Sequence, residues 1–164
     1  MTQYPIKATK GILVDGKAGI RFYEFEQGAE LTTATIMPGD LVEFTNPPGD
    51  CTVKAGQADS AIVLGVANIH PVGAVATPRG GDRLTAYEEG DSVEIMSGPI
   101  VVMLRIAASQ DIQCGEMVQP AASGEVAAYV CGTDNDCQRI AQALETNTAD
   151  TTAFQWGVFA LRMG

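Results

Sequence analysis

The sequence is poor in the residues on which most enzymes and nucleic-acid-binding proteins rely. Its 164 residues include one histidine and ten lysines and arginines against twenty aspartates and glutamates, so the formal net charge is −10. Nucleic-acid binders normally carry a basic patch or stripe, which this balance disfavours. Charged residues make up 18% of the chain and hydrophobic residues 46%, a composition that argues against disorder.

Long apolar runs are also missing. The longest, Ile100–Leu104 followed after Arg105 by Ile106–Ala108, is far shorter than the roughly 20 residues of a membrane-spanning helix. The start of the chain contains no apolar core of a signal peptide. We therefore expect a protein without a membrane partner that is made in a cytoplasm. Its cysteines should be reduced when it folds, and they are Cys51, Cys114, Cys131 and Cys137.

Helical periodicity is scarce, whereas turn residues are abundant. Eighteen glycines and eight prolines separate short runs with the character of strands. The spacing favours a sandwich or barrel over any βαβ arrangement, so we predict an all-β fold. The predicted strands are Leu31–Ile36, Leu41–Phe44, Cys51–Lys54, Ile62–Ile69, Ser92–Met96, Ile100–Ala107, Met117–Pro120, Val126–Val130, Arg139–Leu144 and Gly157–Met163.

An internal repeat is the most informative feature of the sequence. Three segments of one half recur in the same order in the other half, and each copy ends in a final strand. The pairs are Pro38–Val42 with Cys114–Val118, Gly49–Val53 with Gly124–Ala128, Ala61–Ala67 with Arg139–Glu145, and Ser92–Met96 with Gly157–Met163. The repeat predicts an extended N-terminal arm, residues 1–30, a first β repeat, 31–108, with an insertion at 70–89, and a second β repeat, 109–164.

The matched turn glycines Gly39 and Gly115 open a strand in each repeat. Both are expected to hold a positive φ, which only glycine adopts at low cost. Replacement by alanine should then cost about 1 kcal/mol or more at each position. Because the two positions are equivalent, the two costs are expected to be similar.

The N-terminal arm differs in charge from the rest of the chain. Four bases fall in its first 21 residues against one acid, Asp15, and the remainder is strongly acidic. Such an arm suits an acidic neighbouring surface, and its apolar segments Ile12–Val14 and Phe22–Tyr23 could add to a neighbour as a strand. We therefore expect residues 1 to about 25 to contact another subunit and not the core. The four bases are Lys7, Lys10, Lys17 and Arg21.

Glycine-containing phrases follow one order in both repeats. They are Gly39-Asp40-Leu41-Val42, Gly49 with Val53, Ala55 and Gly56, then Gly65-Val66-Ala67, and in the second repeat Ile112, Gly115-Glu116-Met117-Val118, Gly124, Val126 and Ala143-Leu144-Glu145. Over residues 31–164 this order resembles the two-repeat capsid cement, or decoration, proteins of tailed viruses of bacteria and archaea.

The resemblance implies both a fold and a function. The fold is two related small β-barrel or β-tulip-like halves with no catalytic residue and no cofactor. The partner is the major capsid protein, whose assembled lattice such proteins bind on the outer surface of the virion and stabilise, often as a homotrimer. An alternative function is a β-barrel ligand-binding or accessory domain of a cellular enzyme, and neighbouring genes for capsid, protease and portal would separate the two.

The histidine and the cysteines offer little chemistry. Asp59 and Ser60 precede His70, but no nucleophile elbow of the Gly-x-Ser-x-Gly kind is present, and Pro71 indicates that His70 ends a strand. Cys131 and Cys137 enclose Asp134 and Asp136 with a spacing that zinc sites do not use. A solvated turn, a Cys131–Cys137 disulfide formed outside the cell and a metal loop remain three alternatives for this segment.

Other polar clusters are interpreted as loops and rims. Gly11–Gly19 lacks the ending of a phosphate-binding P-loop, and Arg79–Arg83 has no strand and helix around it. The acids Glu88, Glu89 and Asp91 precede a strand as a solvated rim. The sequence therefore predicts no catalytic, cofactor-binding or metal site, and we expect the chain not to be an enzyme.

Overall fold

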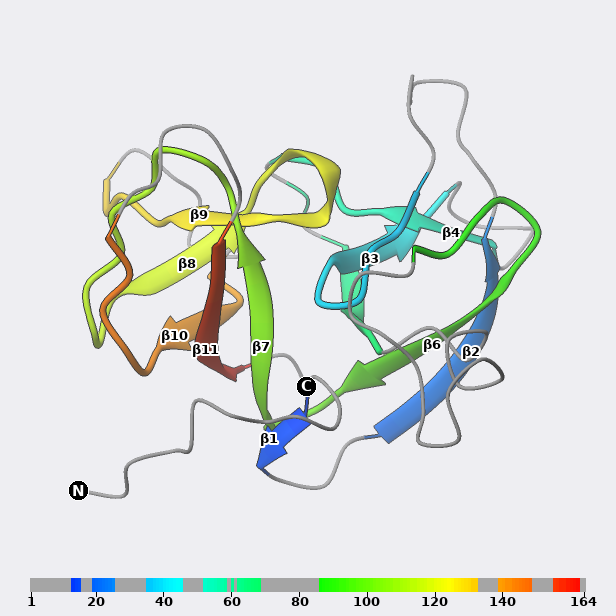
Figure 1. Cartoon of the computed structure of the whole chain (residues 1–164), viewed down its shortest axis with the longest axis horizontal. Helices are drawn as coiled ribbons and strands as arrows, with labels where there is room; N and C mark the ends of the chain where they lie inside the picture. The colour runs from blue at the N-terminus through cyan, green and yellow to red at the C-terminus, as the bar shows by residue number, and fades with distance from the viewer. Residues whose placement is uncertain are drawn as a thin grey trace.

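The computed structural model describes residues 13–15, 19–25, 35–45, 52–58, 60, 62–68, 86–132, 139–148 and 155–162. Apart from one 3₁₀ turn, Ala122–Gly124, the regular elements in these ranges are all β-strands. They form two rings that lie side by side along the long axis of the molecule (Figure 1). The predicted all-β fold with two related barrel-like halves is confirmed.

The first ring is a closed barrel in the order β2-β4-β3-β5-β6. Neighbouring strands are antiparallel except for β2 and β4, which run parallel where Phe25 lies opposite Val53. The closure leaves no free edge within the ring, which removes a common route to aggregation. Its strands are β2 Gly19–Phe25, β3 Leu41–Phe44, β4 Thr52–Ala55, β5 Val63–Ala67 and β6 Ser92–Ser97.

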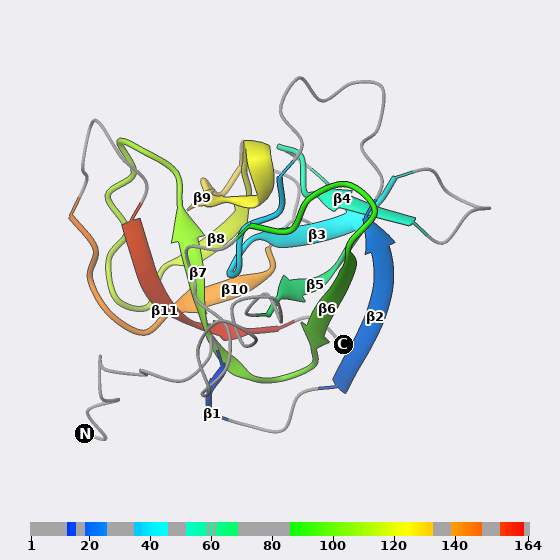
Figure 2. The ribbon, with the colours of Figure 1, turned by 45° about the vertical axis from the view of Figure 1, so that its right-hand side comes forward.

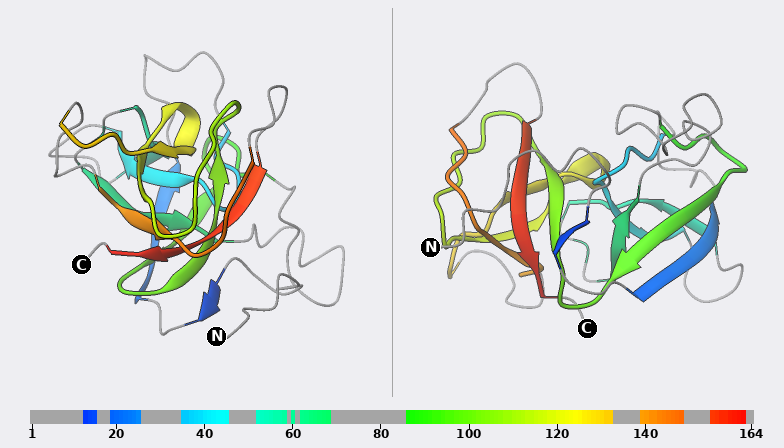
Figure 3. Two further views of the ribbon diagram at one scale, coloured as in Figure 1. Left: turned by 90° about the vertical axis from the view of Figure 1, so that its left-hand side faces the viewer. Right: turned by 60° about the horizontal axis from the view of Figure 1, so that its bottom comes forward.

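The second ring is formed by a six-stranded sheet in the order β1-β7-β11-β10-β8-β9. A further parallel pairing, Ile106 with Val126, joins β7 to β9 and closes it. The right-hand panel of Figure 3 shows the two rings side by side again, and in Figure 2, turned by 45° from the first view, they overlap. Its strands are β1 Leu13–Asp15, β7 Val101–Ile106, β8 Met117–Pro120, β9 Val126–Ala128, β10 Ala141–Ala143 and β11 Gln155–Leu161.

Strand pairing repeats from one ring to the other. Each of the five pairings β2–β4, β2–β6, β3–β4, β3–β5 and β5–β6 has a counterpart of the same direction in β7–β9, β7–β11, β8–β9, β8–β10 and β10–β11. The turns repeat as well, since the Gly39 N–H donates to the Ala67 carbonyl and the Gly115 N–H to the Ala143 carbonyl, both at 2.8 Å. The two halves are thus structural duplicates.

The alignment of the repeats differs from the predicted one at one strand. Val42 lies opposite Gly65, and its counterpart Val118 lies opposite Ala141. Ala141, and not Ala143, is therefore the equivalent of Gly65, two residues earlier than the sequence match of Ala61–Ala67 with Arg139–Glu145. Hydrogen-bond register fixes this equivalence, whereas small apolar residues in both segments allow either match by sequence.

Strand pairing also groups the ends of the chain differently from the predicted boundaries. β2 falls within the predicted arm, yet it pairs with β6 over six residues and with β4, and β1 pairs with β7. The expectation that residues 1–25 avoid contacts within the fold is wrong for these strands, because the first ring needs β2 to close. β7 lies in the predicted first repeat but belongs to the second ring. Residues 1–12, and 70–85 of the predicted insertion, lie outside the described residues.

Two apolar clusters fill the molecule. One lies inside the first ring and includes Val42, Tyr87 and Ile95. The other fills the second ring but also takes in Leu41, Val66 and Met96. These three residues come from β3, β5 and β6 and alternate with the inward-facing residues of the first ring, so they lie on its outer face. This face packs against the second ring.

Candidate functional site

The junction between the rings holds two buried charged residues, Asp40 and Arg105. Its first part is the turn Met37–Asp40, which precedes β3. Asp40 accepts a hydrogen bond from the Met37 N–H at 2.7 Å through Oδ2, and the Asp40 N–H donates to the Met37 carbonyl at 3.0 Å. Gly39 has a φ of +89°, a conformation that glycine adopts without strain. The carboxylate and the glycine together hold the turn closed.

The turn is inserted against the second ring. A Cβ at Gly39 would collide with the indole ring of Trp156 in β11, and the Met103 carbonyl of β7 is also close. The Arg105 N–H donates to the Gly39 carbonyl at 3.3 Å, and the Gly124 N–H donates to the Gly56 carbonyl at 2.8 Å. Glycine at position 39 is therefore required twice, by the positive φ and by the approach of Trp156.

Three charged side chains meet beside this turn. The guanidinium of Arg105 on β7 donates through Nη1 to Asp40 Oδ1 and through Nη2 to Glu125 Oε1, each at 2.7 Å. Asp40 is fully buried and Arg105 is 8% exposed, so the pair lies in a region of low dielectric. Charge-assisted hydrogen bonds of this length are strong, and losing one partner leaves the other charge buried and uncompensated.

The environment changes the acidity of both carboxyl groups. Burial raises the pKa of Asp40 from 3.8 to about 7, although Arg105 acts in the opposite direction. Burial also raises the pKa of the Glu125 carboxyl, again against the effect of Arg105. Two carboxylates and one guanidinium sum to one excess negative charge, and desolvation favours taking up a proton. The two carboxyl groups both contact the guanidinium that joins the rings.

A second buried pair lies in the first ring. Lys54 Nζ is 3.4 Å from Glu43 Oε1, and the two residues face each other across β3 and β4. Glu43 also accepts from the Gln57 N–H at 3.2 Å. This pair links strands within one ring and, unlike Arg105, does not join the two.

Several residues singled out from the sequence lie outside the described part of the chain. These are His70, Cys51, Cys137, Asp59, Asp134, Asp136, Lys7, Lys10, Lys17 and the segment Arg79–Arg83. Ser60 and Arg21 are described, and Arg21 pairs in β2 opposite Ile95. The three alternatives for the loop between Cys131 and Cys137 therefore stay open, while Cys131 and Cys114 are free and exposed.

The acidic rim lies as predicted on the surface. Glu88 and Glu89 are exposed, and the Glu88 N–H donates to Asp91 Oδ2 at 2.8 Å within a turn. Among the described residues no three histidine, cysteine, aspartate or glutamate side chains gather closely enough to hold a metal ion. The same residues contain no helix long and apolar enough to cross a membrane.

The sequence does contain signals for the junction, although they did not enter the predictions above. Arg105 is the only charge in the apolar run from Ile100 to Ala108, and a lone charge in a buried strand needs a partner. Asp40 lies in the repeated turn, so its counterpart Glu116 could be compared with it. The sequence does not reveal that Glu125 and Trp156 approach the same point, because that depends on how the rings dock.

The arrangement of strands is similar to that of a solved phage protein. No known protein family matches the chain, and no curated protein does. Among solved structures, the N base of the head fiber protein gp8.5 of bacteriophage phi29 matches with a TM-score of 0.51, covering 89% of this chain and 95% of that chain. The two share a fold. At 11% sequence identity the similarity concerns the arrangement of the strands alone.

Proposed function

We propose that the chain is a structural protein of a tailed phage particle that decorates the outer surface of the capsid and stabilises the lattice. The observation that carries the proposal is the two-ring fold shared with a phage head fiber base over nearly the full length of both chains. The order of glycine phrases, which resembles capsid cement proteins, supports the same assignment independently of the structure.

The junction suits a protein that acts by binding. The apolar face of the first ring and the charged residues Asp40, Arg105 and Glu125 fix the rings to each other. A rigid ligand loses little conformational freedom on binding, so more of its contact energy appears as affinity. A protein that binds only the assembled lattice stabilises it by mass action, in proportion to free concentration over Kd.

Partner and assembly follow from the same proposal. The partner is the major capsid protein, and the chain is a homotrimer on the particle, with neither nucleic acid nor membrane as a partner. Copies with a net charge of −10 repel one another at low salt. We therefore expect a monomer in dilute solution at low salt and trimers only where the lattice brings copies together.

The test uses particles of the virus whose genome encodes the chain. Purified protein is added to particles that lack it, and bound protein is measured by co-sedimentation, followed by cryo-electron microscopy. We expect saturable binding, density on the outer surface and a higher temperature of capsid disruption. Absence of binding, or a gene surrounded by metabolic genes, would contradict the proposal and favour an accessory domain of a cellular enzyme.

A further inference from the structure

The face by which the first ring docks on the second has an equivalent on the second ring. Matching strand registers and turn hydrogen bonds pairs each docking residue with one in the other ring. The pairs are Gly39 with Gly115, Asp40 with Glu116, Leu41 with Met117, Gly56 with Tyr129, Val66 with Gln142 and Met96 with Ala160. We call the second set the end face.

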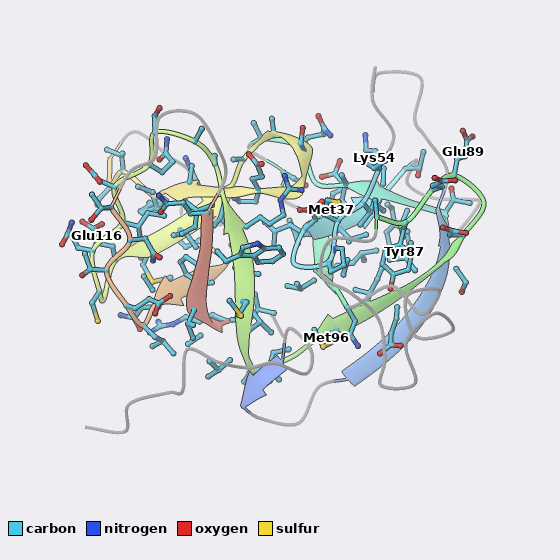
Figure 4. All side chains as sticks on the ribbon, viewed as in Figure 1. Met37, Lys54, Tyr87, Glu89, Met96 and Glu116 are labelled. Atoms are coloured by element: carbon cyan, nitrogen blue, oxygen red, sulfur yellow. The ribbon has the colours of Figure 1, made fainter. Side chains whose placement is uncertain are left out.

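The end face is not covered by the rest of the described chain. Glu116 lies at one extreme of the long axis, whereas Met37 of the equivalent turn lies between the rings (Figure 4). Glu116 and Gly115 are exposed, and a Cβ at Gly115 would have no described atom within 4 Å. The end face is thus an open copy of a surface that is occupied in the first ring.

The turn on the end face has the conformation of the turn that docks. The Gln113 N–H donates to Glu116 Oε2 at 2.8 Å, as the Met37 N–H donates to Asp40 at 2.7 Å. Gly115 has a φ of +94° and Gly39 one of +89°. A carboxylate is therefore presented in a preformed geometry, which lowers the cost of binding.

The composition of the end face is that of an interface. Met117, Tyr129 and Ala160 are half-buried, and Arg139 lies 5.4 Å from the centre of the Tyr129 ring. Methionine, tyrosine and arginine are enriched where proteins meet. Gln142 lies between Met117 and Ala160 in the sheet and accepts a hydrogen bond from Arg162 at 2.7 Å, so the face combines apolar and polar groups.

A second copy of the chain lacks the residues by which the second ring binds the docked turn of the first ring. In the second ring the docked turn meets Arg105 and Trp156, which lie opposite each other in β7 and β11. The equivalent opposed pair in the first ring is Glu24 and Ser92. The first ring thus has neither an arginine nor a tryptophan at the two register positions that receive the docked turn in the second ring. An occupant that binds in the internal mode must therefore supply the cation and the aromatic group.

We propose that the end face is the surface by which the chain docks on the capsid lattice, against a protein that presents an arginine or lysine to Glu116 beside an apolar side chain. The proposal rests on the function proposed above and names the contact surface. The proposed contact resembles the internal junction, in which the equivalent turn, Met37–Asp40, meets the guanidinium of Arg105 and the indole ring of Trp156.

The first experiment measures the affinity of variants for particles that lack the protein. Tyr129→Asp and Glu116→Lys should each weaken binding at least tenfold. Matched controls lie on the first ring: Ile62, which is 48% exposed, changed to Asp, and the exposed Glu89, changed to Lys. Controls that bind as the unchanged protein does support the proposal. Unchanged binding by both end-face variants overturns it while leaving the decoration function intact.

A second experiment needs no capsid and decides the case if the unchanged protein fails to bind particles. Glu24→Arg combined with Ser92→Trp places the residue types of the internal socket, Arg105 and Trp156, at the equivalent register positions of the first ring. We expect this variant to associate head to tail with rising concentration in sedimentation velocity, an open series of the kind that heterologous contacts form. Adding Glu116→Lys should return it to a monomer. A folded double variant that stays monomeric, together with absent particle binding, overturns the docking face.

Discussion

The two rings share one pairing scheme but differ at the same turn. In the first ring Met37–Asp40 is covered by the second ring, and Asp40 is fully buried against Arg105. In the second ring the equivalent turn, Gln113–Glu116, is exposed. Local hydrogen bonds and backbone angles are nearly the same in both. The difference shows that neighbours across the junction, and not the turn itself, decide what the carboxylate contributes.

Removal of the cation at the junction should have the largest effect. Arg105→Ala leaves Asp40 and Glu125 without their shared partner, and breaking a buried pair in this way costs about 3–5 kcal/mol. Urea unfolding at pH 8 measures the loss. At pH 5 Asp40 is protonated, so the loss should be smaller there. Equal losses at both pH values would contradict a charged role for the junction.

Substitution of each turn glycine, Gly39 and Gly115, by alanine compares the two environments directly. The positive φ costs about 1 kcal/mol at either position, but at Gly39 the added methyl also meets Trp156, and overpacking costs typically about 1–3 kcal/mol more. Gly39→Ala should therefore destabilise by about 2–4 kcal/mol and Gly115→Ala by about 1 kcal/mol in thermal unfolding. The positive φ predicted for both glycines is confirmed. The two free-energy costs are no longer expected to be equal, because only Gly39 lies against Trp156. Equal measured costs would contradict this difference.

The junction should also make stability depend on pH. Asp40 has a pKa of about 7 in the folded chain and an ordinary value of 3.8, which we take for the unfolded chain. Between these two pH values the folded state therefore binds a proton that the unfolded state has lost. Stability should fall as pH rises from about 4 to about 7 and level off above that range. Asp40→Asn should flatten the profile by on the order of 1 kcal/mol or more, since one pKa unit corresponds to about 1.4 kcal/mol. A wild-type profile that rises over this range would contradict the argument.

The smallest effect is expected at the exposed counterpart. Glu116→Gln keeps the shape of the side chain and retains an oxygen for the Gln113 N–H, and surface changes of this kind usually stay within about 0.5 kcal/mol. A loss comparable with that of Arg105→Ala would mean that the second turn is also buried in solution.

Glycine and strand patterns predicted the fold class and the duplication. The turn phrases specify local geometry, so Gly39 and Gly115 could be matched by their sequence context alone. It was harder to predict which strands belong to which ring. β2 carries the bulky residues Phe22, Tyr23 and Phe25. No turn motif links it to its partner β6, however, because β6 begins only at Ser92. Long-range pairing of this kind depends on closure of the whole ring and leaves little trace in a short segment.

The candidate site could not be predicted, because its residues meet across two separate units. Arg105 lies 65 residues from Asp40 and 20 residues from Glu125 along the chain, and each has an ordinary local context. Only the isolated charge of Arg105 in an apolar run indicated a buried partner. Trp156 gave no signal, since its contact is with a glycine that lacks a side chain.

The connection between the rings has a consequence for folding during synthesis. Every strand of the first ring has been made once Ser97 has emerged, whereas most of the second ring is still to come, and domains generally fold as units in that order. Until then Leu41, Val66 and Met96 lie on an uncovered apolar face, which favours aggregation of the nascent chain. The next strand to emerge begins at Val101, directly after the short turn that follows Ser97, and its side chains join that same cluster. The strand that begins to cover the apolar face is thus synthesised directly after the strands that form this face.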